Sequence, residues 1–162
     1  MMELAEPKHL AAEISATIDN LEKLWRYDLC RQILEPMVRR RPNDADLRDS
    51  LACSLAQLGE HEAAVAQIDK ALKIIPDNPF FLSNRGWILL MAGRLEEAGE
   101  SLRRALRLRP DHAAAKGNLK CYRYLLRHGC TYLDFLLRPA NRKRIDQLSN
   151  HERWDKADEL SD

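Results

Sequence analysis

Cysteine and histidine are the side chains of this sequence that could bind a metal ion or form a nucleophile and base pair. They are widely scattered, as Cys30, Cys53, Cys121, Cys130, His9, His61, His112, His128 and His151. None of them forms a Cys-x-x-Cys pair or a cysteine and histidine group with the spacing of a zinc site. The sequence also lacks a glycine-rich phosphate loop and a Gly-x-Ser-x-Gly motif. We therefore expect a non-enzymatic chain with reduced thiols, no catalytic residue, no metal site and no cofactor.

Arginine is the other side chain whose clustering could indicate chemistry, namely contact with phosphate groups. The clusters are Arg39 to Arg41, then Arg103, Arg104, Arg107 and Arg109, and finally Arg142, Lys143 and Arg144. Glu96, Glu97 and Glu100 come about one turn before the second cluster, so its arginines can pair with them on a solvated helix face. Nucleic-acid binding is therefore the least favoured function.

Length and charge bound the remaining possibilities. The chain has 162 residues and a net charge of +1 from 26 basic and 25 acidic residues, which fits one domain and does not indicate a polyanionic partner. Residues 1–20 include three glutamates and lack the apolar core of a signal peptide. The longest apolar runs are far shorter than the roughly 20 residues that cross a bilayer. We expect a cytoplasmic protein without a membrane partner.

A tandem repeat of 34 residues must position any functional side chains. Six residues recur at that interval: Gly59, Ala64, Ala71, Leu72, Pro76 and Asp77 return as Gly93, Ala98, Ala105, Leu106, Pro110 and Asp111. Small residues and a closing proline at this period are typical of a helix–turn–helix repeat, whose units are stable only when stacked. The two clear units span residues 45–78 and 79–112, and each is predicted to contain two helices joined at a glycine.

Weaker units flank these two. Residues 11–44 form a degenerate first unit after an extension at 1–10. Trp25 there stands in the column of the turn glycines, and Pro36 is expected to interrupt the second helix. Its inward-facing side chains are expected to be Leu21, Leu24, Leu29, Ile33 and Leu34. Residues 113–137 form a partial fourth unit with a short apolar helix at 130–137 that must be buried by something. Residues 138–162 are predicted to be a capping hairpin or tail.

These columns resemble the tetratricopeptide repeat over residues 11–128. The family pattern of a Leu-Gly pair, a turn glycine, two alanines around a bulky apolar residue and a closing proline is matched by Leu51-Ala52, Gly59, Ala64, Ile68, Ala71 and Pro76, and again by Arg85-Gly86, Gly93, Ala98, Leu102, Ala105 and Pro110. Arg85 departs from the pattern because it replaces a core leucine. The resemblance implies an all-α, right-handed α-solenoid of antiparallel helix hairpins, about three units plus C-terminal capping helices. It also implies that the first helix of each unit lines a concave groove that binds a partner protein.

The groove residues follow from those first helices. They are Asp49, Cys53, Gln57, Phe80, Ser83, Asn84, Trp87, Leu90, Met91, Cys121 and Tyr124. Trp87 with its apolar neighbours has the composition of an interface anchor and favours an apolar ligand segment. The alternative is that the chain's own helix at 130–137 covers Trp87 and Tyr124, and the two interpretations are compatible if that helix acts as a lid. Some family members bind acidic C-termini through Lys, Asn and Arg, whereas Asp49 and Cys53 occupy those columns here.

The function that these observations favour is a protein–protein interaction scaffold, an adaptor or a chaperone-like protein, that binds an apolar segment of a partner as a peptide or helix. One alternative is a self-associating subunit of a larger assembly, a homo-oligomer joined through the helix at 130–137. Another is a protein similar to the small chaperones of type III secretion, whose size and apolar groove agree with this chain.

Overall fold

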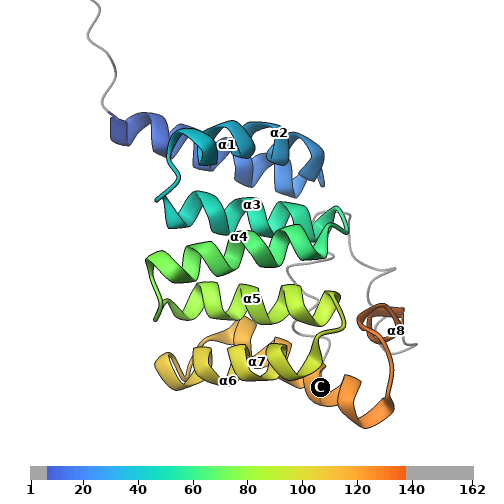
Figure 1. Ribbon diagram of the computed structural model, residues 1–162. Helices are drawn as coiled ribbons and strands as arrows, with labels where there is room; N and C mark the ends of the chain where they lie inside the picture. Colours follow the sequence, from blue (N-terminus) through green and yellow to red (C-terminus); the bar gives the residue numbers. More distant parts are fainter. Residues whose placement is uncertain (1–6, 138–162) are drawn as a thin grey trace, which may run out of the picture.

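The computed structural model describes residues 7–137, so most of the predicted N-terminal extension and the whole predicted capping hairpin at 138–162 lie outside it (Figure 1). The described residues form eight helices and no strand. They are α1 (Pro7–Lys23), α2 (Tyr27–Arg40), α3 (Ala45–Gln57), α4 (His61–Ile74), α5 (Pro79–Met91), α6 (Leu95–Leu108), α7 (Ala113–His128) and α8 (Tyr132–Leu137). The predicted all-α fold is confirmed.

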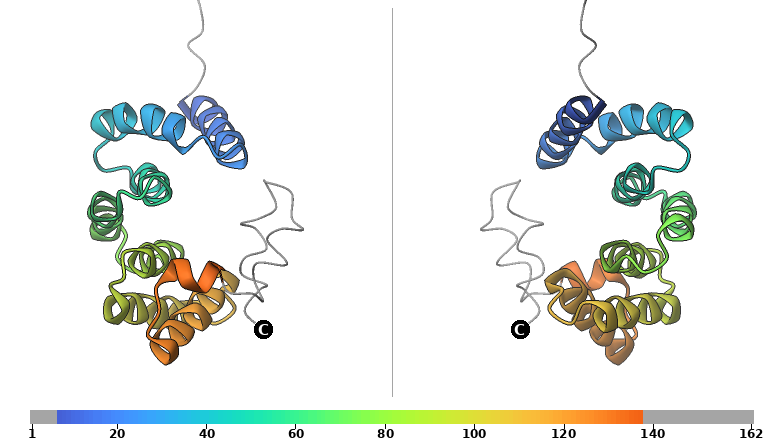
Figure 2. Two further views of the ribbon diagram at one scale, coloured as in Figure 1. Left: turned by 90° about the vertical axis from the view of Figure 1, so that its right-hand side faces the viewer. Right: turned by 90° about the vertical axis from the view of Figure 1, so that its left-hand side faces the viewer.

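Successive helices form hairpins that stack into an arc. The closest pairs are α3 with α4 and α5 with α6, and α3, α5 and α7 also contact one another in sequence order. Seen along the helices, α1, α3, α5 and α7 lie on the inner side of the arc, while α2, α4 and α6 lie on its outer side (Figure 2). The first helix of each hairpin therefore lines the concave face, and the molecule is a helical repeat solenoid.

Local signals set the helix ends. The Asp44 carboxylate accepts a hydrogen bond from the Leu47 amide at 3.1 Å and begins α3. The Asn78 side chain accepts bonds from the amides of Phe80 and Phe81 and begins α5, where Pro79 lacks the N–H that would otherwise need a partner. These capping residues recur 34 positions apart and therefore repeat the same hairpin entrance.

The turn inside each hairpin has the same backbone geometry in all three units. The amides of Arg26, Glu60 and Arg94 donate to the carbonyls five residues earlier at 2.9 Å. Gly59 and Gly93 adopt φ values of 82° and 75°, and Trp25 adopts 60° in the same column. A side chain makes this left-handed conformation costly for Trp25, so the first unit keeps the turn at the expense of strain.

The core follows the repeat columns. The alanines and the bulky apolar residues of the repeat pattern are fully buried on the second helices of the two clear units. They are Ala64, Ile68, Ala71, Ala98, Leu102 and Ala105, and Cys30 in the first unit is also fully buried. A Cβ atom on Gly86 would lie 2.5 Å from Cγ of Leu102. Because that separation is far below van der Waals contact, only glycine at position 86 allows α5 and α6 to approach this closely.

Two expectations for the first unit are wrong. Helix α2 continues through Pro36 to Arg40, since a single missing amide bond does not end a helix that is packed on its neighbours. Leu24 is 68% exposed because it lies in the turn after α1 rather than on the inward face of that helix. Of the other leucines and isoleucine in that set, Leu34 is buried and the rest are half-buried.

Arg85 stands where the repeat pattern has a core leucine, and it makes polar contacts with the neighbouring helices. Its guanidinium donates to Oδ1 of Asp69 and to Oγ of Ser101, both at 2.7 Å, and lies 3.5 Å from the Glu97 carboxylate. These partners belong to α4 and α6, on either side of α5. The departure from the repeat pattern is therefore a charged network that joins three helices, since charge-assisted hydrogen bonds are stronger than neutral ones.

Candidate functional site

The predicted groove residues occupy the inner helices but differ widely in exposure. Phe80 is 50% exposed, and seven others are half-buried: Asp49, Cys53, Gln57, Asn84, Trp87, Met91 and Tyr124. Ser83, Leu90 and Cys121 are buried, with 4% exposure or less. These three side chains pack in the core and expose almost no surface, although Leu90 also borders the cavity described below.

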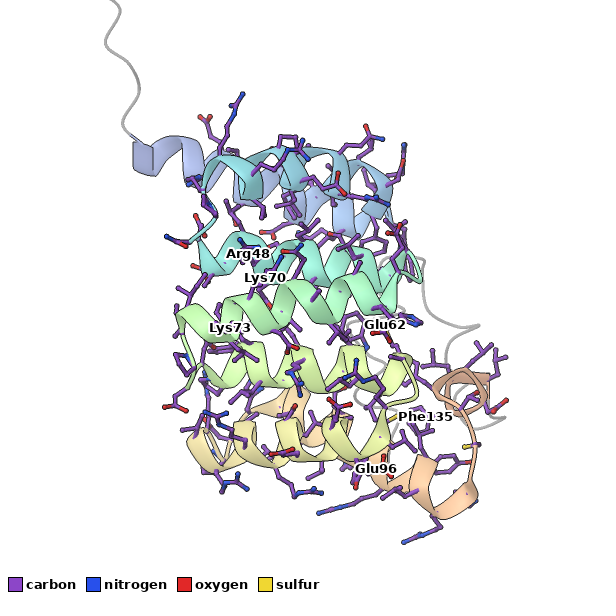
Figure 3. The ribbon with its side chains drawn as sticks, in the orientation of Figure 1. Arg48, Glu62, Lys70, Lys73, Glu96 and Phe135 are labelled. Atoms are coloured by element: carbon purple, nitrogen blue, oxygen red, sulfur yellow. The ribbon has the colours of Figure 1, made fainter. Side chains whose placement is uncertain are left out.

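Helix α8 lies over part of the concave face. The indole Nε1 of Trp87 donates a hydrogen bond to the hydroxyl of Tyr132 at 3.2 Å. Phe135 is 5% exposed, and its ring centroid lies 5.2 Å from that of Tyr124 in an edge-on arrangement. Figure 3 shows Phe135 on the side of α8 that faces the repeats. The apolar helix that the sequence placed at 130–137 therefore covers Trp87 and Tyr124.

A cavity remains beside this contact. Its volume is about 490 Å³, and it lies between the α5–α6 turn, the end of α7 and the start of α8. Its lining is mostly apolar and consists of Leu90, Met91, Ala92, Gly93, Leu95, Leu125, Gly129, Cys130, Thr131 and Tyr132. Leu95, Leu125 and Cys130 were not among the predicted groove residues, because only the return of α8 brings the ends of α5, α6 and α7 to one site.

Phe80 lies apart from the Trp87 contact. Its ring centroid is 4.8 Å from that of His112, and the Arg109 guanidinium lies 5.1 Å above the ring. Both partners belong to the connection between α6 and α7. Phe80 therefore packs on the neighbouring repeat at the opposite end of α5 from Met91.

The α1–α3 end of the concave face is acidic. Both carboxylate oxygens of Asp49 accept hydrogen bonds from Nδ2 of Asn84, at 2.9 and 3.0 Å. Burial raises the pKa of Asp49 to about 6, and the charge of Asp46 acts in the same direction, whereas the Asn84 bond opposes it. Burial, with help from Asp19 and Asp49, also raises the pKa of Glu22. Burial and the charges of Asp49 and Glu22 raise the pKa of the Cys53 thiol. Cys53 is therefore an unreactive thiol.

A second cavity, of about 240 Å³, opens at this acidic end. Its apolar lining is Ile14, Ile18, Leu34, Met37 and Leu47, and its polar lining is Ser15, Asp19, Glu22, Arg41, Asp44, Asp46 and Ser50. Glu22 was not among the predicted residues. The spacing of three between Asp19 and Glu22, and between Asp46 and Asp49, was the available signal, because residues three apart share a helix face.

The outer face mixes charges of both signs. Lys70 and Lys73 lie toward one end of this face, and Glu62 and Glu96 lie toward the other end, on the side of α8 (Figure 3). Arg104 pairs with Asp77 at 2.7 Å, and Arg103 lies 5.7 Å from the ring centroid of Tyr122. Arg103 and Arg104 of helix α6 therefore have partners within the protein.

Within residues 7–137, no three His, Cys, Asp or Glu side chains are grouped so as to hold a metal ion. None of the eight helices combines the length and the apolar composition that crossing a membrane requires.

Solved structures with a similar fold are repeat domains. The first TPR domain of human RPAP3 superposes with a TM-score of 0.67 at 21% identity, covering 74% of this chain and 94% of that one. The first TPR of Spaghetti (RPAP3), bound to an HSP90 peptide, superposes with a TM-score of 0.65 at 20% identity, covering 72% of this chain and 93% of that one. The structure of Naa15/Naa10 bound to HypK superposes with a TM-score of 0.61 at 21% identity. The match covers 92% of this chain and 24% of that one. Identities this low show the shared fold.

Sequence comparison identifies the repeats directly. A TPR repeat-containing protein of Pseudomonas aeruginosa is 36% identical over 80 residues, which is 49% of this chain and 14% of that protein. A TPR repeat-containing thioredoxin of Arabidopsis thaliana is 39% identical over 61 residues, 38% of this chain and 9% of that one. The chain thus spans no more than 14% of these curated relatives. The family model of the tetratricopeptide repeat matches residues 21–79 and again 50–113, more than half of the sequence. The chain belongs to the tetratricopeptide repeat family.

Proposed function

We propose that this chain is a non-catalytic protein-interaction scaffold, an adaptor or chaperone-like protein, that holds an apolar segment of a partner protein where α8 meets the repeats. The observation that carries the proposal is the apolar cavity of about 490 Å³ that is lined in part by Tyr132, the hydrogen-bond partner of Trp87. A cavity of this size falls within the range of about 300–1,000 Å³ that is typical of ligand sites, and burying a leucine-sized side chain there contributes about 1.5–3 kcal/mol.

The lining suits a ligand that varies in shape. Met91 and Cys130 border the cavity, and the unbranched methionine side chain adapts to irregular apolar surfaces. The turn that contains Gly129 connects α7 to α8, and α8 has only six residues. Movement of this short helix away from Trp87 would enlarge the apolar surface, while its return would cover that surface in the free protein. Helix α8 is then a lid on the binding site.

The relatives support a binding role of this kind. One neighbour with this fold is bound to an HSP90 peptide, and another is bound to HypK. The ligand of this chain differs from an acidic peptide in our proposal, since Asp49, Glu22 and Asp46 would repel carboxylates on the concave face. The four cysteines are free thiols, which agrees with a cytoplasmic site of action.

Self-association is a second candidate, favoured by exposed leucines at the end of the solenoid. Leu126 on α7 and Leu133 and Leu137 on α8 are 52%, 62% and 56% exposed. Light scattering across a concentration series tests this candidate, because a dimer joined there would dissociate on dilution and would be weakened by Leu133→Ser.

The binding proposal is tested by site-specific photo-crosslinking in the native cell. A photoreactive phenylalanine analogue at position 91 should give discrete adducts with one or a few proteins, whereas the same analogue at position 63 on the exposed surface of α4 should not. The identified partner is then titrated with the purified full chain.

In that titration Met91→Gln should weaken binding by more than about tenfold, while Ala63→Gln should leave it unchanged. Circular dichroism and the thermal midpoint show that both variants are folded. Equal affinities for the two variants would place the binding surface elsewhere and overturn the proposal.

A further inference from the structure

Four carboxylates at the α1–α3 end of the concave face have no cationic partner among the described residues. Asp19, Glu22 and Asp46 make no ion pair or side-chain hydrogen bond there, and Asp49 is bonded only to the neutral amide of Asn84. On the outer face, by contrast, Asp69, Asp77 and Glu97 each pair with an arginine. The inner carboxylates therefore form a region of uncompensated negative charge.

This charge surrounds an apolar groove rather than an open surface. Ile18 and Leu34 are 5% and 1% exposed in the floor of the 240 Å³ cavity, where Met37 and Leu47 complete the apolar lining. Arg41 also borders the cavity, but it pairs with Asp44 at 3.4 Å. An apolar floor with an acidic rim fits a segment that carries lysine or arginine together with aliphatic side chains, because their long stems can lie on apolar surface while their charges face the carboxylates.

A segment with this composition follows α8 in the same chain. Arg142, Lys143 and Arg144 are succeeded by Ile145 and Leu148, and all of them lie outside the described residues. The described chain ends with α8, which contacts α5 and α7 and lies on the inner side of the arc (Figure 2). The basic run thus begins five residues after the point where the chain leaves the concave face.

The separation between α8 and the α1–α3 groove can be compared with the length of chain that follows Leu137. Packed helices lie about 8–10 Å apart, so two steps from α5 through α3 to the α1–α3 groove amount to roughly 20 Å. Five to seven extended residues span up to about 17–25 Å. By these figures the backbone of Arg142, five residues after Leu137, falls short of that separation, whereas residues 144–148, seven to eleven residues after Leu137, span it with length to spare for an offset along the helix axes.

We propose that residues 142–148 of this chain dock in the acidic groove between α1 and α3, with the three basic side chains facing Asp19, Glu22, Asp46 and Asp49 and an aliphatic side chain in the cavity. The C-terminal segment then spans the concave face from α8 to α1. The proposal does not depend on a ligand for the cavity at α8, so it can hold or fail separately from the proposed function.

Zero-length carbodiimide cross-linking of the full chain tests the docking directly. Lys143 should be joined within one chain to Glu22, Asp19 or Asp46, and this product should decrease several-fold at 0.5 M salt, where screening shortens the range of charge interactions. Mixing unlabelled and nitrogen-15-labelled protein shows whether each cross-link lies within one chain or joins two chains. Mixed-isotope pairs would assign the groove to a second copy and overturn the proposal, as would cross-links spread equally over Glu62 and Glu96 on the outer face.

Trypsin cleavage supplies a second measurement without adding new cleavage sites. In the double variant Glu22→Gln/Asp46→Asn, cleavage after Arg142, Lys143 and Arg144 should be at least about fivefold faster than in the native full chain at low salt. Glu96→Gln is the matched control on the exposed outer face and should cleave at the native rate. Equal rates for the double variant and the native protein, with both folded by circular dichroism, would overturn the proposal.

Discussion

The indole Nε1 of Trp87 donates a hydrogen bond to the hydroxyl of Tyr132, which is 45 residues later in the chain, at 3.2 Å. This bond joins the middle of the repeat array to the short helix that follows it. Trp87, the residue predicted to be the interface anchor, therefore already has a partner within the protein. A ligand at this site competes with α8, and the stability of the contact sets how readily the site opens.

Removing the Tyr132 hydroxyl should weaken this contact. In Tyr132→Phe the half-buried Trp87 N–H loses its acceptor, so we expect the free energy of unfolding to fall by about 0.5–1.5 kcal/mol. Urea denaturation followed by Trp fluorescence measures the change. Tyr122→Phe is the control, because Tyr122 stacks with Arg103 through its ring and keeps that contact as phenylalanine. Equal losses in the two variants would show that the Trp87 bond contributes nothing specific.

A charge at Ala71 should disrupt the array. Ala71 is fully buried on α4, so Ala71→Glu places a carboxylate at a close contact between helices and should cost roughly 3 kcal/mol or more. Ala66 is exposed on the same helix and provides the matched substitution Ala66→Glu, which should change stability by less than about 0.5 kcal/mol. Thermal denaturation compares them. A normal midpoint for Ala71→Glu would contradict the assignment of the repeat columns.

A methyl group at position 86 should also be destabilising. The new Cβ would lie 2.5 Å from the Leu102 side chain, and overpacking of this kind typically costs about 1–3 kcal/mol. Alanine gains about 1 kcal/mol over glycine in helix propensity, so the net loss in Gly86→Ala is smaller than the clash alone. The double variant Gly86→Ala/Leu102→Val should lose less than the sum of the single losses. Additive losses would show that residues 86 and 102 do not compete for the same space.

Asp49 should make stability fall as the pH rises from about 4 to 6. Its pKa is raised from the ordinary 3.8 to about 6 in the folded protein, so the folded state binds the proton more tightly than the unfolded chain does. The resulting stabilisation is complete below the lower pKa and is lost as the pH passes through the upper one. Asp49→Asn removes the charge and leaves a side-chain oxygen for the Asn84 amide.

At pH 7 this variant should therefore be more stable than the native protein by roughly 1–3 kcal/mol, since each pKa unit corresponds to about 1.4 kcal/mol. The difference should decrease towards pH 4. Denaturation at pH 4 and pH 7 measures both values. A native protein that is as stable as Asp49→Asn at pH 7 would contradict the raised pKa.

The sequence by itself determined the helical hairpins and their repetition. Gly59 and Gly93 mark the turns, and columns of small residues such as Ala71 and Ala105 recur at 34 residues. These features follow from local backbone preferences and from the need of each hairpin to bury one face against its neighbours, so they are encoded within each unit. The family and the all-α fold follow from the same pattern.

Only the tertiary structure decided which inner residues remain accessible. Ser83, Leu90 and Cys121 are buried by neighbouring hairpins, and Arg85 finds partners on two other helices, because the packing of adjacent units depends on how they rotate against one another. Helix α8 departs from the 34-residue period, so no repeat column predicts where it returns. Its position over Trp87, and the approach of Glu22 to Asp49 from a separate helix, result from contacts between segments distant in sequence, which a local pattern does not specify.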